Sequence, residues 1–281
     1  MFDMLKFLWK NKPAHSDTQP AVGVPPVARP TNVHSVGVYS EDVHSDDMHS
    51  DDEHPIVAVR PRRILVANGK GGCGKTTIAT NLAGSLAARG RMTALLDYDP
   101  QGSSMQWLSV RRNAPPIHGV AAHRPPGAGM TRTFALRLPL GTERVILDVP
   151  AGIHGLQLID LLRDVDVIVI PVMPSAIDIH AAARFIQELL LTGKVRARSV
   201  QVGVVANRVK ENSHAFKNLQ RFLSTLSIPF ITRLRDSENF VTAAETGISI
   251  SELPKAHRRD LLLWEELVRW VEGEPPLRRE R

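Results

Sequence analysis

Residues 69–77 are Gly-Lys-Gly-Gly-Cys-Gly-Lys-Thr-Thr, and this stretch decides the fold. A glycine, four intervening residues and then Gly74, Lys75 and Thr76 form the spacing of a phosphate-binding P-loop. Glycines let successive backbone N–H groups point at phosphate oxygens, the lysine reaches the β- and γ-phosphates, and the threonine hydroxyl ligates Mg²⁺. The sequence therefore predicts nucleotide contacts from Gly69, Gly71, Gly72, Cys73, Gly74, Lys75, Thr76 and Thr77.

The residues on either side of this loop support the prediction. The apolar run 64–67 before it predicts a buried strand. Residues 76–89 after it predict a helix, with Ile78, Leu82 and Leu86 on one face and Gly90 at its end. Because a helix N-terminus favours anions, a strand, a glycine loop and a helix in this order predict a phosphate site.

Lys70 lies inside the loop, where most P-loops accept any residue. The sequence Lys-Gly-Gly-x-Gly-Lys-Thr-Thr resembles the deviant Walker A motif of the ParA/MinD ATPases. In that family the extra lysine crosses a nucleotide-sandwich dimer and contacts the phosphates bound by the partner subunit. The resemblance implies this role for Lys70, beside Lys75 as the ordinary P-loop lysine. The simpler interpretation is a solvated loop lysine.

Two carboxylates follow the next apolar run, which begins at Thr93. Residues 97–102, Asp-Tyr-Asp-Pro-Gln-Gly, resemble the segment that ends the family's second strand. The resemblance implies that Asp99 positions or activates the attacking water and that Asp97 lies nearer the metal. The alternative is that both aspartates only cap a turn before Pro100.

A later strand supplies the other carboxylate. Residues 144–152 resemble the Walker B strand and the switch loop after it, which implies that Asp148 joins Thr76 in holding the Mg²⁺ shell. Asn207 follows the apolar run that starts at Val202 and matches the family's strand-end asparagine near the adenine. A strand-terminal asparagine is also a common turn residue.

These motifs stand in the family's order over residues 63–272. The resemblance implies an α/β fold: a doubly wound, mainly parallel sheet with helices on both faces and ATP at the C-terminal ends of the strands. Apolar runs at 166–172 and 202–208 predict further strands, and 258–271 predicts a last helix. We expect three parts: an N-terminal extension 1–62, the ATPase domain 63–272, and a polar tail 273–281.

The first 62 residues are rich in Pro, Ser, Asp and His, a composition that predicts a disordered tail. Residues 40–54 repeat a five-residue unit ending in histidine, which fits a weak divalent-metal site or, more simply, a solvated low-complexity segment. Residues 1–10 are apolar on one helical face. This segment could dock on a partner or a membrane surface, pack on the body, or fray.

Charge is unevenly distributed along the chain. Residues 1–62 hold six basic and nine acidic residues, whereas residues 63–281 carry about +9. A basic body with an acidic tail indicates polyanion binding that the tail could tune, although a solubilising extension explains the tail equally well. We expect non-specific DNA contacts from members of a basic set in the C-terminal half: Arg208, Lys210, Lys217, Arg221, Arg233, Arg235, Lys255, Arg258 and Arg259.

Composition excludes several other classes. The single cysteine forms no intramolecular disulfide and cannot supply a bridging iron–sulfur cluster, which argues against the reductase relatives. Only two tyrosines are present, which argues against the tyrosine-kinase relatives. The sequence has no 18-residue apolar segment and no secretion signal, so we expect a cytoplasmic protein.

The resemblance thus implies a ParA-like ATPase that forms a homodimer with ATP and Mg²⁺ and associates with nucleoid DNA. An adaptor with a ParB-like role would stimulate its slow hydrolysis, and the cargo would be a plasmid, a chromosome region or a protein-shelled compartment such as a carboxysome. The alternative is a MinD-like regulator on a membrane surface, for which only residues 1–10 could serve as an anchor.

Overall fold

The computed structural model describes residues 60–276, apart from 128, 130, 132, 134, 135, 192–199 and 227. The repeat 40–54 and the segment 1–10 lie outside the described residues, as does nearly all of the N-terminal extension 1–62, so the predictions for them stay predictions. The strands are β1 (Arg62–Val66), β2 (Thr93–Asp97), β3 (His118–Val120), β4 (Arg144–Asp148), β5 (Val167–Val172), β6 (Gln201–Val209) and β7 (Phe230–Arg235).

Helices connect these strands. The α-helices are α2 (Lys75–Ala88), α3 (Ser103–Val110), α5 (Gly155–Leu161), α6 (Ala176–Leu191), α8 (His214–Ser224), α9 (Glu238–Thr246) and α10 (Arg258–Glu272). Two short 3₁₀ turns, η1 (Leu162–Asp164) and η2 (Ile250–Glu252), complete the described elements. The predicted strands and helices agree with these elements to within a residue or two at their ends.

The strands form one seven-stranded sheet in the order β3-β2-β4-β1-β5-β6-β7, and every neighbouring pair is parallel. β1 lies in the middle, with Ile64 in register with Ile146 of β4 on one side and Val167 of β5 on the other. The predicted doubly wound parallel sheet is confirmed. Its C-terminal edge gathers the ends of β1, β2, β4 and β6 and the loops that follow them, where the predicted nucleotide and metal residues lie.

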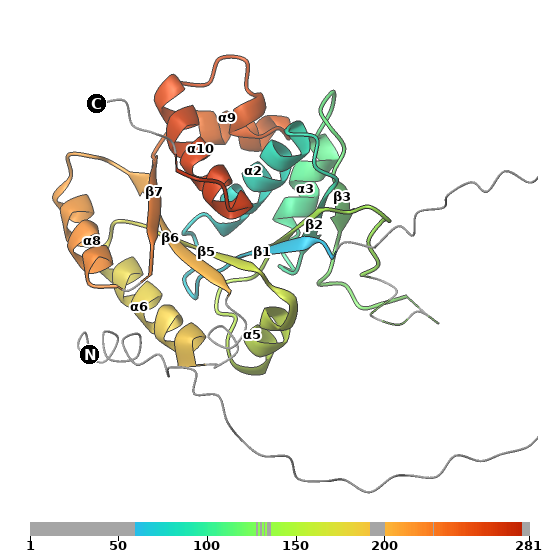
Figure 1. The fold of residues 1–281 in the computed structure, drawn as a ribbon, viewed down its shortest axis with the longest axis horizontal. Helices are drawn as coiled ribbons and strands as arrows, with labels where there is room; N and C mark the ends of the chain where they lie inside the picture. The colour runs from blue at the N-terminus through green and yellow to red at the C-terminus, as the bar shows by residue number, and fades with distance from the viewer. Residues whose placement is uncertain are drawn as a thin grey trace, which may run out of the picture. The chain divides into compact units, whose positions relative to one another are not determined.

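The central strands contain continuous apolar runs, as expected where both faces of a sheet are covered. Ile64, Leu65 and Val66 of β1 have no exposed surface, and all six residues of β5 are buried. Helices α2, α3, α9 and α10 lie on one face, whereas α5, α6 and α8 lie on the other (Figure 1). The two faces bury separate apolar clusters, the first around Trp264 and the second around Phe185 and Phe222.

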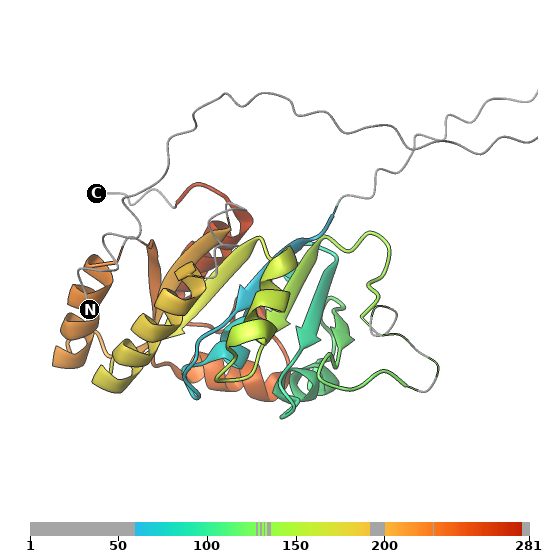
Figure 2. The same ribbon diagram turned by 90° about the horizontal axis from the view of Figure 1, so that it is seen from below.

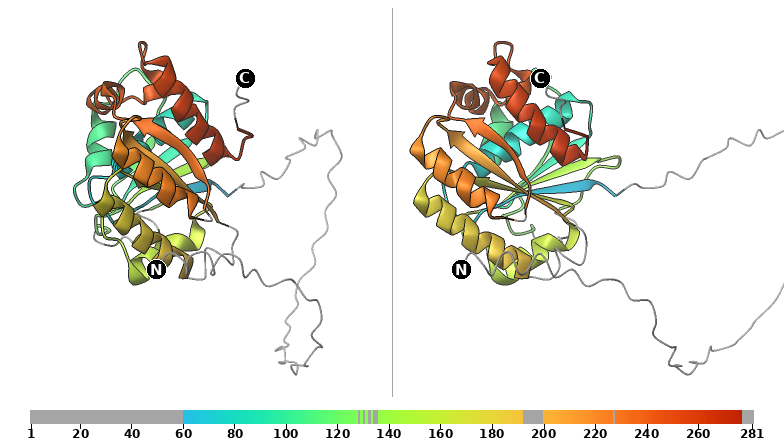
Figure 3. Two further views of the ribbon diagram at one scale, coloured as in Figure 1. Left: turned by 90° about the vertical axis from the view of Figure 1, so that its left-hand side faces the viewer. Right: turned by 60° about the vertical axis from the view of Figure 1, so that its left-hand side comes forward.

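The edge strands differ from the central ones. β3 has three residues, two of them exposed, and ends the sheet beside β2. At the other edge, α6 and α8 lie side by side and cover β5 and β6 (Figure 2), and α10 covers β7 from the opposite face (Figure 3). Among the described helices, none is both long and apolar enough to cross a bilayer.

Candidate nucleotide site

The loop between β1 and α2 turns at Gly72 and Gly74, whose φ angles are 76° and 93°. At Gly74 an added Cβ would lie 2.1 Å from Asn207 Nδ2, so the position requires glycine for space as well as for backbone conformation. Gly74 is also the N-cap of α2, and no side chain caps the helix there. The first N–H groups of α2 therefore remain available to phosphate oxygens.

The two loop lysines are in different situations. Lys75 is 7% exposed, and its Nζ donates a hydrogen bond of 3.2 Å to the main-chain carbonyl of Lys70. Lys70 is half-buried, and its ammonium makes no hydrogen bond or ion pair with the residues that the structure describes. Lys75 is thus held inside the loop, and a role for Lys70 in contacting a partner's phosphates stays a prediction.

Three further contacts fix the loop to its neighbours. The buried amide of Asn68 donates to Pro171 O, near the end of β5, and accepts from the backbone N–H of Lys70. The Gly152 N–H, in the loop after β4, donates to Gly69 O at 3.1 Å. From β6, Asn207 Nδ2 donates to Cys73 O at 2.9 Å. The P-loop is therefore bonded to three strand ends.

Asp148 is 1% exposed at the end of β4, and Ser104 Oγ donates to its Oδ2 at 2.8 Å. Burial raises the pKa of this carboxyl to about 6, while the Ser104 and Thr76 hydroxyls and the Lys75 ammonium oppose the rise. Its Oδ1 is one of two buried side-chain polar atoms that have no hydrogen-bond partner among the described residues. A buried carboxylate oxygen of this kind has a lone pair free to accept a further bond.

These residues fit Mg²⁺, which prefers oxygen ligands and is held in P-loop proteins by a hydroxyl and a carboxylate. Thr76, in the first turn of α2, and Asp148 would hold it. Bound there, the ion would neutralise charge on the phosphate oxygens.

Asp97 has no exposed surface, and both of its oxygens are engaged. Oδ1 accepts from the Asp99 N–H at 3.0 Å, and Oδ2 accepts from the Met105 N–H at 3.2 Å. Burial raises its pKa, and these two backbone N–H groups oppose the rise. Asp97 thus caps the turn into α3, and its metal role stays a prediction. Asp99 is half-buried, and its Oδ1 accepts from the Gln101 N–H at 3.0 Å.

The structure brings the predicted P-loop residues, Asp97, Asp99, Asp148 and Asn207 to one edge of the sheet. It places Asn207 against the P-loop, and an adenine contact for this residue stays a prediction. Sequence reasoning missed Asn68 and Ser104 as members of the site. The sequence offered one clue for Asn68, which is a polar residue directly after an apolar strand. It offered no clue for Ser104.

The nine predicted DNA contacts fall into two groups. Arg233 and Arg259 both pair with Glu211, at 2.9 Å and 2.6 Å, and Arg235 pairs with the buried Asp260 at 2.6 Å. These three cations are bound within the chain. The other six are exposed and form no ion pair with any described residue: Arg208, Lys210, Lys217, Arg221, Lys255 and Arg258.

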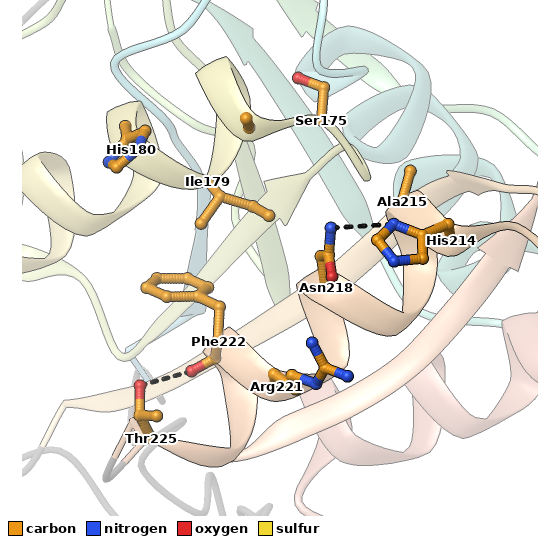
Figure 4. A pocket seen from close by; sticks show the side chains of 10 residues that line it. Ser175, Ile179, His180, His214, Ala215, Asn218, Arg221, Phe222 and Thr225 are labelled. Atoms are coloured by element: carbon orange, nitrogen blue, oxygen red, sulfur yellow. Dashed lines mark hydrogen bonds between the residues drawn. The ribbon is translucent and has the colours of Figure 1, made fainter.

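A groove of about 520 Å³ lies between α6 and α8 (Figure 4). Ile179 and Phe222 lie on its two sides, with His180, His214 and Arg221 around them. None of the predicted nucleotide or metal residues lines it. The groove is therefore separate from the candidate nucleotide site.

Comparison with known proteins gives a consistent result. A family model described as the CobQ/CobB/MinD/ParA nucleotide binding domain matches residues 64–250. The maintenance of carboxysome distribution protein A of Halothiobacillus neapolitanus is 30% identical over 194 residues, which are 68% of this chain and 87% of that protein. The chromosome-partitioning ATPase Soj of Thermus thermophilus is 50% identical over 56 residues, which are 20% of this chain and 22% of that protein.

Among solved structures, a complex of a Cyanothece McdA variant with ATP aligns with a TM-score of 0.56 and 20% identity. The alignment covers 77% of this chain and 98% of that one. At this identity the likeness shows the fold.

Proposed function

Because the chain belongs to the MinD/ParA family of nucleotide-binding ATPases, we propose that it is a positioning ATPase that dimerises on ATP and binds DNA without sequence preference. A cognate adaptor stimulates its hydrolysis, which releases the dimer from the nucleoid. Such an enzyme acts as a switch, since ATP shifts the population between free and DNA-bound forms.

The pair of loop lysines is the observation that carries this proposal. Lys75 already lies inside the P-loop, bonded to the carbonyl of Lys70, where an incoming phosphate would replace the carbonyl as its partner. The Lys70 ammonium has no partner among the described residues, although it starts from the same loop. A second subunit facing this edge of the sheet would bring nucleotide phosphates to it, which explains a lysine in a loop that needs only one.

Hydrolysis needs an oriented water and compensation of the charge on the phosphates. Lys75 and the α2 N-terminus bind the phosphates, and Thr76 and Asp148 supply the metal ligands. Asp99 orients the water from the turn after β2. Its carboxylate is held by the Gln101 N–H, and its own N–H donates to the buried Asp97, so the turn is fixed before substrate binds.

The basic residues support a DNA-binding face. The Arg259–Glu211 pair brings the start of α10 beside the loop after β6, which gathers Arg208, Lys210 and Arg258 in one region. These cations form no ion pairs with described residues and are exposed, as contacts to phosphates require.

A protein-shelled compartment is the cargo that we propose. The relative that matches two thirds of this chain is named for carboxysome distribution, whereas the chromosome-partitioning relative matches one fifth of it.

Binding to a random-sequence DNA duplex, with ATP and with ADP at two salt concentrations, tests the proposal. We expect tight binding only with ATP, weakened strongly by salt because phosphate contacts release counterions. The Lys75→Ala variant is the control and should bind in neither state. If the wild-type protein does not bind DNA in either nucleotide state and instead pellets with liposomes in the presence of ATP, the MinD-like alternative replaces this proposal.

A further inference from the structure

Ser104 is a fully buried serine in the first turn of α3, and its hydroxyl donates to Asp148 Oδ2 at 2.8 Å. Its neighbour Ser103 begins the same helix and is exposed. The two residues have the same type of side chain, but only the Ser104 hydroxyl bonds to the Asp148 carboxylate. The contact spans 44 residues of sequence and joins α3 to the end of β4.

The hydroxyl is held firmly in place. The next residue along α3, Met105, donates its N–H to Asp97 Oδ2, and Asp97 is the register partner of Asp148 on the neighbouring strand. The start of α3 is therefore bonded to both carboxylates that end β2 and β4. A shift of the backbone at Ser104 away from Asp148 would therefore also disturb the Asp97 contact.

The two oxygens of the Asp148 carboxylate are in different situations. Oδ2 is occupied by Ser104, whereas Oδ1 is buried and has no hydrogen-bond partner among the described residues. With one oxygen bonded, the carboxylate has a fixed rotation, and the other oxygen keeps a single direction. Hydrogen-bond partners behind a metal ligand orient it in this way and raise metal affinity.

We propose that Ser104 is a positioning residue for the magnesium site, fixing the Asp148 carboxylate so that Oδ1 joins the metal shell. The inference rests on the proposed ATPase function. It adds a residue that belongs neither to the P-loop, nor to the Asp97–Gly102 turn, nor to the strand that ends at Asp148. It also links the turn that carries Asp99 to the metal, since that turn leads directly into α3, from which both contacts come.

The test is the affinity for ATP, measured by calorimetry with Mg²⁺ and again with EDTA, in the full chain. Ser104→Ala should weaken ATP binding about tenfold with Mg²⁺ and leave binding in EDTA unchanged. Ser103→Ala is the matched control and should behave as the wild type in both buffers. Ser104→Cys keeps the size and replaces the hydroxyl by a weak donor, so it should also lose Mg²⁺-dependent affinity even if the alanine variant does not fold.

Two results overturn the inference while leaving the proposed function intact. In one, the variants keep the wild-type ratio of affinities with and without Mg²⁺. In the other, they lose affinity equally in both buffers, which would mean that Ser104 acts only through the fold. If the wild-type chain itself binds no ATP, the proposed function fails first.

Discussion

The side-chain amide of Asn207, at the end of β6, donates a hydrogen bond of 2.9 Å to the main-chain carbonyl of Cys73 in the P-loop. Both residues are buried, and the donating nitrogen fills the space beside Gly74 where other residues carry a Cβ. The nucleotide loop is therefore shaped by a residue more than 130 positions away in the sequence.

Gly74→Ala should disable this loop. The new Cβ would have to displace Asn207 and break its bond to Cys73, in addition to the strain of a φ of 93°. We expect a loss of about 3 kcal/mol in the free energy of unfolding and no detectable ATP binding. Gly72→Ala is the control: its φ is 76° and its Cβ meets nothing within 4 Å, so it should cost only about 1 kcal/mol. Equal losses in urea unfolding would contradict this assignment.

Asp148→Asn should stabilise the metal-free protein near neutral pH. Burial raises the pKa of Asp148 from 3.8 to about 6, so the folded chain keeps a proton that the unfolded chain releases. Wild-type stability therefore falls as the pH rises from about 4 to about 6, by up to about 3 kcal/mol. The asparagine has no charge to bury, so its advantage should be about 1–3 kcal/mol at pH 7 and vanish near pH 4. Urea unfolding in EDTA between pH 4 and pH 7 measures the difference in stability between the variant and the wild type. A difference that does not change with pH would show that the buried charge of Asp148 is not its cause.

Lys75→Ala and Lys70→Ala should separate nucleotide binding from dimerisation. Lys75 lies inside the loop, so its loss should abolish ATP binding by the monomer. The Lys70 ammonium has no partner in the described part of the chain, so its loss should spare monomer binding and prevent the ATP-dependent dimer. Calorimetry reports the first property and sedimentation with ATP the second. Equal loss of ATP binding in both variants would rule out a role for Lys70 across a dimer.

Asp99→Ala should trap the ATP state. Its carboxylate contacts only the Gln101 N–H among the hydrogen bonds of the described residues, so its removal should leave the fold and ATP binding unchanged. We expect hydrolysis to fall at least a hundredfold, the usual size of such an effect, and the protein to remain on DNA. Release from DNA in ATP would show that the carboxylate has another function.

Arg235→Ala should destabilise the protein rather than weaken DNA binding alone. Arg235 pairs with Asp260, whose side chain has no exposed surface and also accepts bonds from Ser237 and Asn239. Removing the cation leaves a buried charge with neutral donors only, at a cost of about 3 kcal/mol. Lys255→Ala is the matched comparison: it is exposed and unpaired with described residues, so stability should change by less than about 0.5 kcal/mol. The variant should instead bind DNA more weakly, and the slope of the logarithm of its DNA affinity against the logarithm of the salt concentration should fall by about one.

Several features of the site follow from local sequence alone. The P-loop needs glycines at fixed spacing and a lysine at the helix start, and the strands that carry Asp97 and Asp148 are continuous apolar runs. Both requirements are local, so reading along the chain predicts them. The basic surface was less predictable, because Arg233, Arg235 and Arg259 differ from their unpaired neighbours only through carboxylates that the fold brings to them.

The parallel α/β fold, the phosphate loop and the carboxylates at the strand ends could all be predicted from the sequence, because periodicity, glycine spacing and strand composition act over a few neighbouring residues. The long-range contacts emerged only from the folded chain: Ser104 donates to one oxygen of Asp148, and Asn207 donates to the carbonyl of Cys73. These two hydrogen bonds of about 3 Å join residues 44 and 134 positions apart, and that proximity arises only when the parallel strands align their ends at one edge of the sheet.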